Sequence, residues 1–250
     1  MSIHKYMLYT SNDDFWKPIV EKSEISHFAM LLSNVEYQLY NGTKKQKGDA
    51  LEDLMTQLYK RFPSITQVKH DLHTSDNQID HEIIFGNFGL PQFIQDNVGK
   101  SFLSECKNHQ NSLSSREVDN LDGLLSSHDL RFGVFASYKS FSKGLDGSNW
   151  KNAEGKRRKL ALISSFKRTI VGIDFQDLKN IVFKRANLLT ILENKRASLI
   201  NEGAQHEDDI ELSHQEYLFN LLKELRLNEI MTHQETKQYQ EKIRLKYPEE

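Results

Sequence analysis

The stretch Ser101-Phe102-Leu103-Ser104-Glu105-Cys106-Lys107 carries the clearest indication of fold and chemistry in the chain. Its pattern is typical of a β-strand, in which successive side chains point to opposite faces. Glu105 and Lys107 therefore share one face of the strand, and Cys106 points to the other. The flanking Phe102 and Leu103 favour a buried strand, so this acid and this lysine are the first candidates for a chemical site.

A second carboxylate lies upstream in Gln78-Ile79-Asp80-His81, on a predicted strand over residues 78–85. If the two strands pair, Asp80 lies beside Glu105, and two carboxylates held that close repel each other unless a cation lies between them. Mg²⁺ is the expected cation, because it binds one or two carboxylates and leaves positions open for water and phosphate oxygens. Such an ion can polarise a phosphodiester and help ionise an attacking water, which Lys107 is placed to orient.

Helices and strands alternate around these two strands. The sequence predicts helices over 24–40, 50–62, 114–127, 152–165 and from 174 onward, strands over 65–71, 78–85, 101–107, 131–137 and 168–173, and a loop over 86–99. Capping-box spacing marks three helix starts, at Ser114 with Glu117, Ser213 with Glu216 and Thr232 with Glu235. The α-β-β-β-α-β order of the central elements indicates a mixed α/β domain.

We expect the chain to have three parts: a helical N-terminal segment over residues 1–43, the α/β domain over 44–185 and a helical C-terminal region over 186–250. Within the last part, the polar, glycine-containing segment 201–209 predicts a mobile linker. A helical hairpin is expected to follow, at about residues 213–246.

The predicted hairpin consists of the apolar run Leu218–Leu227, a turn at Asn228 and an Ile230-x-Thr232 start to a second helix. It resembles the short helical-hairpin modules called SHOCT. A two-helix unit of this size buries too little apolar surface to be stable alone. We therefore expect it to dock on a regulatory partner or on a copy of itself, and the chain to form a homodimer or a higher oligomer.

The composition excludes some classes of protein. A formal net charge of −2 gives no general attraction to nucleic acid, so a DNA-binding surface has to come from local clusters of basic residues. Cys106 is the only cysteine, which excludes an internal disulfide and a Cys-rich zinc site. No apolar stretch is long enough for a secretory signal or a transmembrane helix, so we expect a soluble, cytoplasmic protein with no membrane contact.

The strongest concentration of basic residues is Lys156-Arg157-Arg158-Lys159, with Lys151 just before it. Against the acidic net charge of the chain, this cluster predicts a surface that binds DNA phosphates. The solvated face of a helix explains the same pattern equally well.

Asp80, followed by Glu105-Cys106-Lys107 and preceded by a helix that carries Gly48-Asp49-Ala50-Leu51-Glu52, resembles the PD-(D/E)xK nuclease superfamily. The likeness is greatest to its Mrr-like restriction endonuclease group and covers residues 44–140. Ile79 stands where the name of the superfamily has proline.

The resemblance implies a restriction-endonuclease-like core with helical extensions at both ends. It implies that Asp80 and Glu105 bind Mg²⁺, with Mn²⁺ as a substitute, that Lys107 acts with the attacking water, and that Glu52 assists from the first core helix. The implied activity is that of a metal-dependent DNA endonuclease, and a role in restriction or anti-phage defence rests on this resemblance alone.

Other interpretations stay open. Glu105 and Lys107 also fit a surface ion pair on an edge strand, with Asp80 beside a turn, and Glu52 fits a solvated position on an amphipathic helix. At the level of function, the alternatives are an effector nuclease that a partner or small ligand activates, and a catalytically inactive DNA-binding or scaffold protein with a nuclease-like fold.

Overall fold

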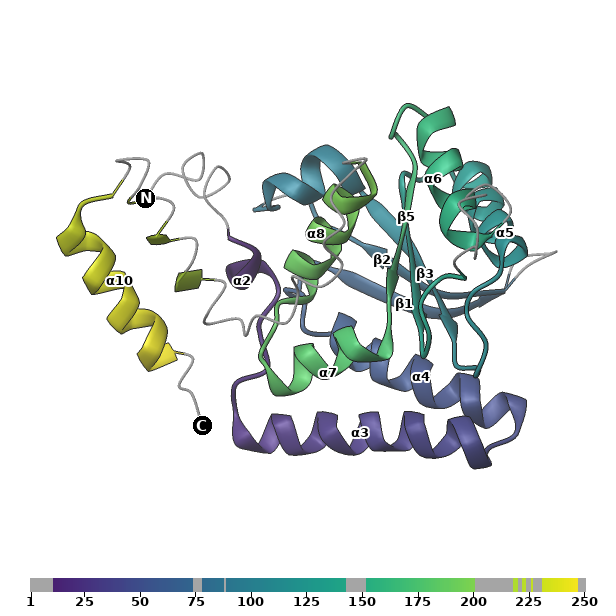
Figure 1. Cartoon of the computed structure of the whole chain (residues 1–250), viewed down its shortest axis with the longest axis horizontal. Helices are drawn as coiled ribbons and strands as arrows, with labels where there is room; N and C mark the ends of the chain where they lie inside the picture. Colours follow the sequence, from purple (N-terminus) through teal and green to yellow (C-terminus); the bar gives the residue numbers. More distant parts are fainter. Residues whose placement is uncertain are drawn as a thin grey trace.

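A five-stranded mixed sheet forms the centre of the protein (Figure 1). The computed structural model describes residues 11–73, 78–87, 89–142, 152–200, 218–219, 222–223, 226 and 231–246. The strands lie in the order in which they follow one another in the sequence: β1 (Gln67–His73), β2 (Gln78–Ile84), β3 (Ser101–Lys107), β4 (Phe132–Ser137) and β5 (Thr169–Ile173). β1, β2 and β3 are antiparallel, whereas β3, β4 and β5 are parallel. This is the mixed α/β sheet flanked by helices that the sequence predicts.

Helices cover both faces of the sheet (Figure 1). α5 (Ser115–Ser127) and α6 (Ala153–Ile163) connect the parallel strands and pack on one face, as helical crossovers do. The other face is covered by α4 (Lys44–Tyr59), α7 (Phe175–Phe183) and α8 (Leu188–Ile200), and α3 (Lys22–Asn41) packs against α4 and α7. Each face therefore has its own apolar core.

The larger core extends into both the N-terminal and the C-terminal parts of the chain. Phe15 and Trp16, at the end of α2 (Asn12–Phe15), are buried with residues of α4 and α8. The Trp16 indole donates to the Leu58 carbonyl at 3.0 Å, and the Asn187 amide donates to the Trp16 carbonyl at 2.9 Å. The expected boundaries at residues 43 and 185 thus do not coincide with breaks in this core.

The helix starts carry the hydrogen bonds that their sequences predict. At α5, the Glu117 carboxylate accepts from the Ser114 backbone N–H at 2.6 Å, and the Ser114 hydroxyl accepts in return from the Glu117 N–H. Thr232 and Glu235 form the same reciprocal pair at the start of α10 (His233–Lys246). The pair of Ser213 and Glu216 lies outside the described residues, as does most of the predicted linker and hairpin.

One element differs from its prediction. The expected loop over 86–99 contains a short π-helix, η1 (Ile94–Val98), which buries Ile94 and Val98 and ends at Gly99 with φ of +84°. A single wide turn is too short to produce a recognisable helical period in the sequence. Among the described helices, none combines the length and the hydropathy needed to cross a membrane.

Candidate active site

β2 and β3 separate at Asp80, and the candidate site lies at this point. Their pairing runs from Ile84 with Ser101 to His81 with Ser104 and stops there, although β3 continues beside β4 as far as Lys107. Beyond His81, the Asp80 carboxylate accepts a hydrogen bond from the Cys106 backbone N–H at 2.7 Å. The Asp80 side chain thus takes the place of a backbone carbonyl of β2 as the acceptor for the Cys106 N–H. The two strands therefore separate beside Glu105.

The backbone around Asp80 is irregular in a way that turns this carboxylate toward β3. Asp71 lies between the paired positions His70 with His81 and Leu72 with Ile79, and its φ of +53° is a left-handed conformation that is uncommon for a residue other than glycine. Strict alternation would place Ile79 and Ile83 on one face of β2. Instead they are buried in the cores on opposite faces of the sheet, so the strand twists sharply between them.

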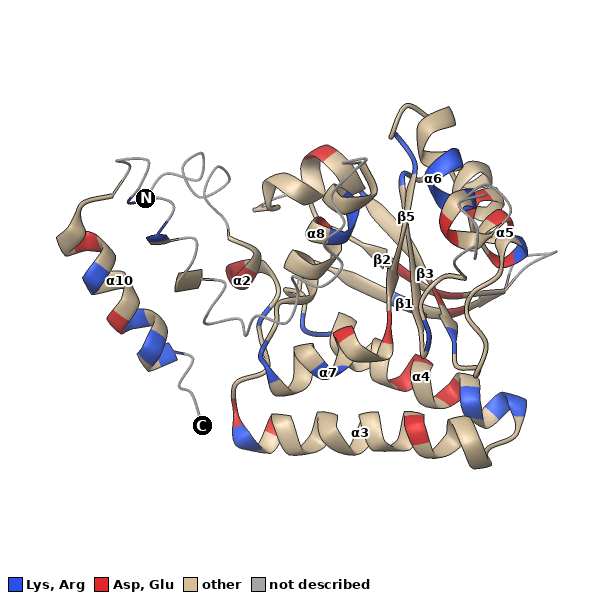
Figure 2. Cartoon of the chain, in the orientation of Figure 1, with Lys and Arg blue, Asp and Glu red and all other residues tan. Residues whose placement is uncertain are grey.

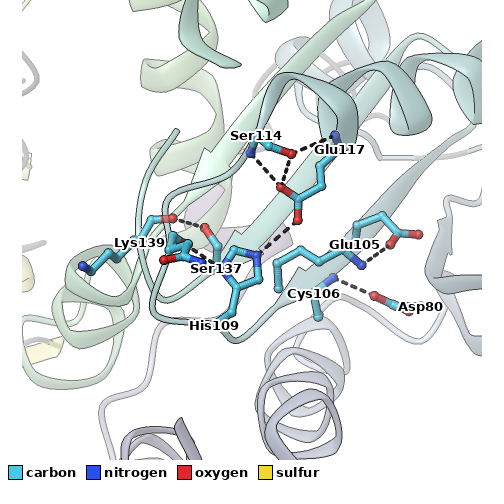
Figure 3. Close-up of polar contacts among 10 residues, drawn as sticks. Asp80, Glu105, Cys106, His109, Ser114, Glu117, Ser137 and Lys139 are labelled. Atoms are coloured by element: carbon cyan, nitrogen blue, oxygen red, sulfur yellow. Dashed lines mark hydrogen bonds and ion pairs between the residues drawn. The ribbon is translucent and has the colours of Figure 1, made fainter. Parts of the chain in front are cut away.

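Asp80, Glu105 and Lys107 converge at the opening. The Lys107 Nζ lies 3.1 Å from the Glu105 Oε2, and the Asp80 carboxylate lies near enough for its charge to raise the pKa of Glu105. Figure 3 shows both carboxylates beside Cys106, with Asp80 joined to the Cys106 backbone nitrogen by a hydrogen bond. Both groups are negative when ionised, so they repel each other unless nearby positive charge compensates.

Glu105 leaves one oxygen unsatisfied. Its Oε1 is buried and has no hydrogen-bond partner among the described residues. An unsatisfied buried carboxylate oxygen destabilises a folded protein, and binding a cation removes that cost. The unpartnered Glu105 Oε1 is therefore the feature of the site that fits a bound metal ion.

Glu52 joins the group from α4. Burial, followed by the negative charges of Asp80 and Asp71, raises the pKa of Glu52 to about 7. Burial, followed by the charge of Asp80, likewise raises the pKa of Glu105 to about 7, against the opposing effect of Lys107. For the Lys107 ammonium, burial favours a lower pKa, but the charges of Glu105 and Asp80 outweigh it and raise that pKa. The structure therefore brings together all four residues that the sequence singled out.

Asp71 is a neighbouring acid that sequence analysis missed. Its charge contributes to the raised pKa values of both Glu52 and Asp80. Asp71 reaches the site only because β1 pairs with β2, and the register of that pairing cannot be read from a local sequence pattern.

A buried hydrogen-bonded chain behind the carboxylates ties α4 to the sheet. The Thr56 hydroxyl donates to the Glu52 carbonyl at 2.7 Å and lies 2.7 Å from the His81 Nε2. Because this hydroxyl has a single proton, the His81 Nε2 must be the donor to it. Burial lowers the pKa of His81 to about 4, so the imidazole is neutral at pH 7 and serves to position the turn of α4 that carries Glu52.

His109 and Asn108, just beyond Lys107, have separate roles. The Asn108 amide is buried and donates to the Val35 and Lys47 carbonyls at 3.2 and 3.0 Å, which joins α3, α4 and the end of β3. The His109 ring contacts the Glu117 carboxylate at 3.1 Å and the Asn111 carbonyl at 2.6 Å. In Figure 3, His109 and Ser137 lie along the same end of the sheet as Asp80 and Glu105.

The expected DNA-binding cluster on α6 is largely engaged with the protein itself. The Arg157 side chain is only 8% exposed, pairs with Glu154 at 2.7 Å and lies over the Phe141 ring at 4.8 Å. Arg157 therefore serves the packing of α6, and its role as a DNA contact remains an untested prediction. Lys156 pairs with Asp119 at 2.8 Å and Arg158 with Glu154 at 2.9 Å. Lys159 is exposed, and Lys151 lies outside the described residues.

Two carboxylates, and not a larger cluster of ligands, are the donors that the described residues bring together at the site. Within the described part of the chain, no three His, Cys, Asp or Glu side chains converge as such a cage. Mg²⁺ normally takes one or two carboxylates and completes its octahedral shell with waters. Asp80 and Glu105 can supply those two carboxylates, with Glu52 beside them.

Comparisons with known proteins do not assign the chain to a family. Neither a protein-family model nor a curated protein sequence matches it. Among solved structures, the chain is similar to the DNA modification-dependent restriction endonuclease AspBHI, with 12% sequence identity and a TM-score of 0.35. That match covers 72% of this chain and 42% of the endonuclease, so the chain spans less than half of the enzyme it resembles.

Proposed function

We propose that this protein is a Mg²⁺-dependent nuclease that hydrolyses phosphodiester bonds in DNA. The observation that carries the proposal is the buried, unpartnered Glu105 Oε1, beside Asp80 and Lys107 where β2 and β3 separate. A purely structural ion pair leaves that oxygen unexplained. The pattern of Asp80 with Glu105-x-Lys107, which resembles PD-(D/E)xK nucleases, supports the same activity.

The residues divide the work as follows. Asp80 and Glu105 would hold Mg²⁺, and the ion when bound stabilises charge on phosphate oxygens and favours ionisation of a coordinated water. Lys107 uses one N–H toward Glu105 Oε2, and its remaining N–H groups can orient the attacking water or stabilise the negative phosphate. The Glu52 carboxylate can accept the proton that this water loses.

A covalent thiol intermediate is not part of the proposal. Cys106 is buried and points toward the core on the α4 face, away from Glu105 and Lys107. Burial, followed by the charges of Asp80 and Glu52, raises the pKa of the Cys106 thiol well above its ordinary value. The thiol therefore stays protonated and unreactive at neutral pH.

DNA as the substrate, a role in restriction or anti-phage defence, and a location in the cytoplasm extend the proposal beyond the site itself. The substrate and the defence role are supported by the sequence resemblance, and the cytoplasmic location by the single cysteine, Cys106, which fits a reducing compartment. An assembly through the C-terminal helices would supply a second active site for the other strand of a duplex.

The direct test is cleavage of supercoiled plasmid, methylated and unmethylated, with an RNA of matched length as a second substrate. We expect nicked or linear DNA with Mg²⁺ or Mn²⁺, and intact DNA with EDTA. Ca²⁺ should support binding with little cutting, because it is larger and looser in geometry. Undiminished cutting in EDTA, or cleavage of RNA alone, would contradict the proposal, and binding of DNA without cutting under any metal would favour a scaffold.

The role of Glu52 can be tested through Gly48. A Cβ at this position would lie 3.3 Å from the Glu52 Oε1, so Gly48→Ala should push the carboxylate aside and reduce cleavage several-fold. The same change removes a glycine from a helix interior, which should raise the free energy of unfolding by roughly 0.5–1 kcal/mol.

The matched control is Gly123→Ala in α5, where a Cβ meets nothing within 4 Å. This variant should gain similar stability and cut at the wild-type rate. Equal cleavage rates for the two variants would show that the position of the Glu52 carboxylate does not matter.

A further inference from the structure

Two groups of basic residues differ in whether their charges are paired with carboxylates of the protein. We call Lys44, Lys45 and Lys47, in the first turn of α4, the corner lysines. None of them takes part in an ion pair with another residue of the described part of the chain, and Lys44 and Lys45 are exposed. On α6, by contrast, Lys156, Arg157 and Arg158 all face a carboxylate. Figure 2 shows both groups, at the start of α4 and on α6.

The corner lysines lie next to the candidate active site. The Asn108 amide, one residue beyond Lys107, donates to the Lys47 carbonyl at 3.0 Å. The Glu52 carboxylate folds back over Gly48, where a Cβ would be 3.3 Å from its oxygen. Lys44 is one helical turn before Gly48, a rise of roughly 6 Å along the axis. Phosphates of one DNA strand are spaced by about 3.4 Å along the duplex axis, so this rise corresponds to about two nucleotides.

Aromatic side chains border the same corner. Tyr37 and Tyr40, in the last turn of α3, are 62% and 61% exposed. The Glu36 carboxylate, one helical turn before Tyr40, accepts a hydrogen bond from the Tyr138 hydroxyl at 3.1 Å. Tyr138 directly follows β4, so this end of α3 lies toward the end of the sheet that carries the site. Exposed aromatic rings beside lysines are typical of surfaces that bind nucleic acid strands.

We infer that the DNA strand being cut runs from the carboxylates over the corner between α3 and α4, where Lys44 and Lys45 bind the phosphates next to the reacting one. This inference rests on the proposed function and names the surface that the substrate uses. The α6 helix plays no comparable part.

The test measures binding of a fluorescent DNA duplex in Ca²⁺ over a range of salt concentrations. The double variant Lys44→Ala/Lys45→Ala should weaken binding about 10-fold at moderate salt. It should also lower the slope of log Kd against log salt by about 2, which is the loss of two phosphate contacts. The matched control Lys156→Ala/Arg158→Ala removes as much charge and should change binding less than about twofold.

Further measurements keep the outcome specific. Lys44→Arg/Lys45→Arg should restore binding, and all variants should melt near the wild-type temperature because the altered side chains are on the surface. In plasmid cleavage with Mg²⁺, the corner double variant should raise KM and leave kcat nearly unchanged. Equal losses in the corner and α6 variants, or a larger loss in the α6 variant, would overturn the inference while leaving the nuclease intact. A wild-type protein that neither binds nor cuts DNA would overturn both the inference and the proposed function.

Discussion

Replacing Glu105 by Gln, or Asp80 by Asn, should lower the rate of DNA cleavage at least about 100-fold while making the metal-free protein more stable. Each change keeps the shape of the side chain and removes one of the negative charges that lie close together in the site. In Asp80→Asn the amide oxygen can still accept from the Cys106 N–H, which now receives a carboxylate oxygen at 2.7 Å. In EDTA we expect a melting temperature about 2–4 °C higher, the shift that roughly 1 kcal/mol produces in a chain of this size.

The pH dependence of stability gives this prediction a definite sign. The pKa of Glu105 is raised from its ordinary value of 4.5 to about 7 in the folded protein. A carboxyl whose pKa is raised on folding binds its proton more tightly in the folded state. Its contribution is therefore fully present below pH 4.5 and is lost as the pH rises toward about 7. Glu105→Gln should flatten this decline, because the amide does not ionise.

Thermal melts in EDTA between pH 4.5 and 8, together with plasmid cleavage in Mg²⁺, test both halves of the prediction. Addition of Ca²⁺ should stabilise the wild type more than either variant, since each variant has lost a ligand. A variant that cuts at the wild-type rate would remove that residue from the active site. A melting temperature well below that of the wild type in EDTA would show that the carboxylate serves the fold instead.

The parts of the fold that follow from local pattern were predictable from the sequence. β3 occupies the expected residues because alternation and burial coincide there, and the capping boxes at Ser114 and Thr232 begin helices as predicted. One part of the site was predictable from the sequence. Glu105 and Lys107 are two residues apart in a strand, and side chains at that spacing point to the same face. The proximity of Asp80 required one further assumption, that β2 and β3 are neighbours, and that assumption is confirmed.

The features that sequence analysis missed depend on contacts between distant segments. The twist of β2 that separates Ile79 from Ile83 accompanies the left-handed conformation of Asp71 on the neighbouring strand. The burial of Trp16 depends on α4 and α8, which no local pattern connects with the N-terminal segment. The pairing of Arg157 within α6 is of another kind. Glu154 precedes Arg157 and Arg158 by three and four residues, a spacing at which opposite charges meet on a helix, so the sequence already contained the neutralising partner.

Lys107→Met should have the opposite effect on stability from Glu105→Gln, although both should abolish efficient cleavage. The ammonium lies 3.1 Å from Glu105, and its charge counteracts part of the rise in the pKa values of Asp80, Glu105 and Glu52. Its removal leaves these acids with no compensating cation. Removing one partner of a buried pair is strongly destabilising. Because the Lys107 side chain is 33% exposed, solvent screens part of this effect. We expect a loss of roughly 1–3 kcal/mol in EDTA, seen as a lower melting temperature.

Metal should reverse that loss. Lysine is not a ligand, so Lys107→Met should bind Ca²⁺ at least as tightly as the wild type, and saturating Ca²⁺ should bring the two melting temperatures together. The double variant Lys107→Met/Glu105→Gln should be close to the wild type in EDTA, because the two charge losses compensate. As a matched control, Lys69→Met removes a lysine that pairs with Glu82 at 3.6 Å on the sheet surface, and it should alter neither cleavage nor metal binding. If Lys107→Met instead stabilises the metal-free protein, or cuts DNA at the wild-type rate, the lysine neither balances the carboxylates nor takes part in the chemistry.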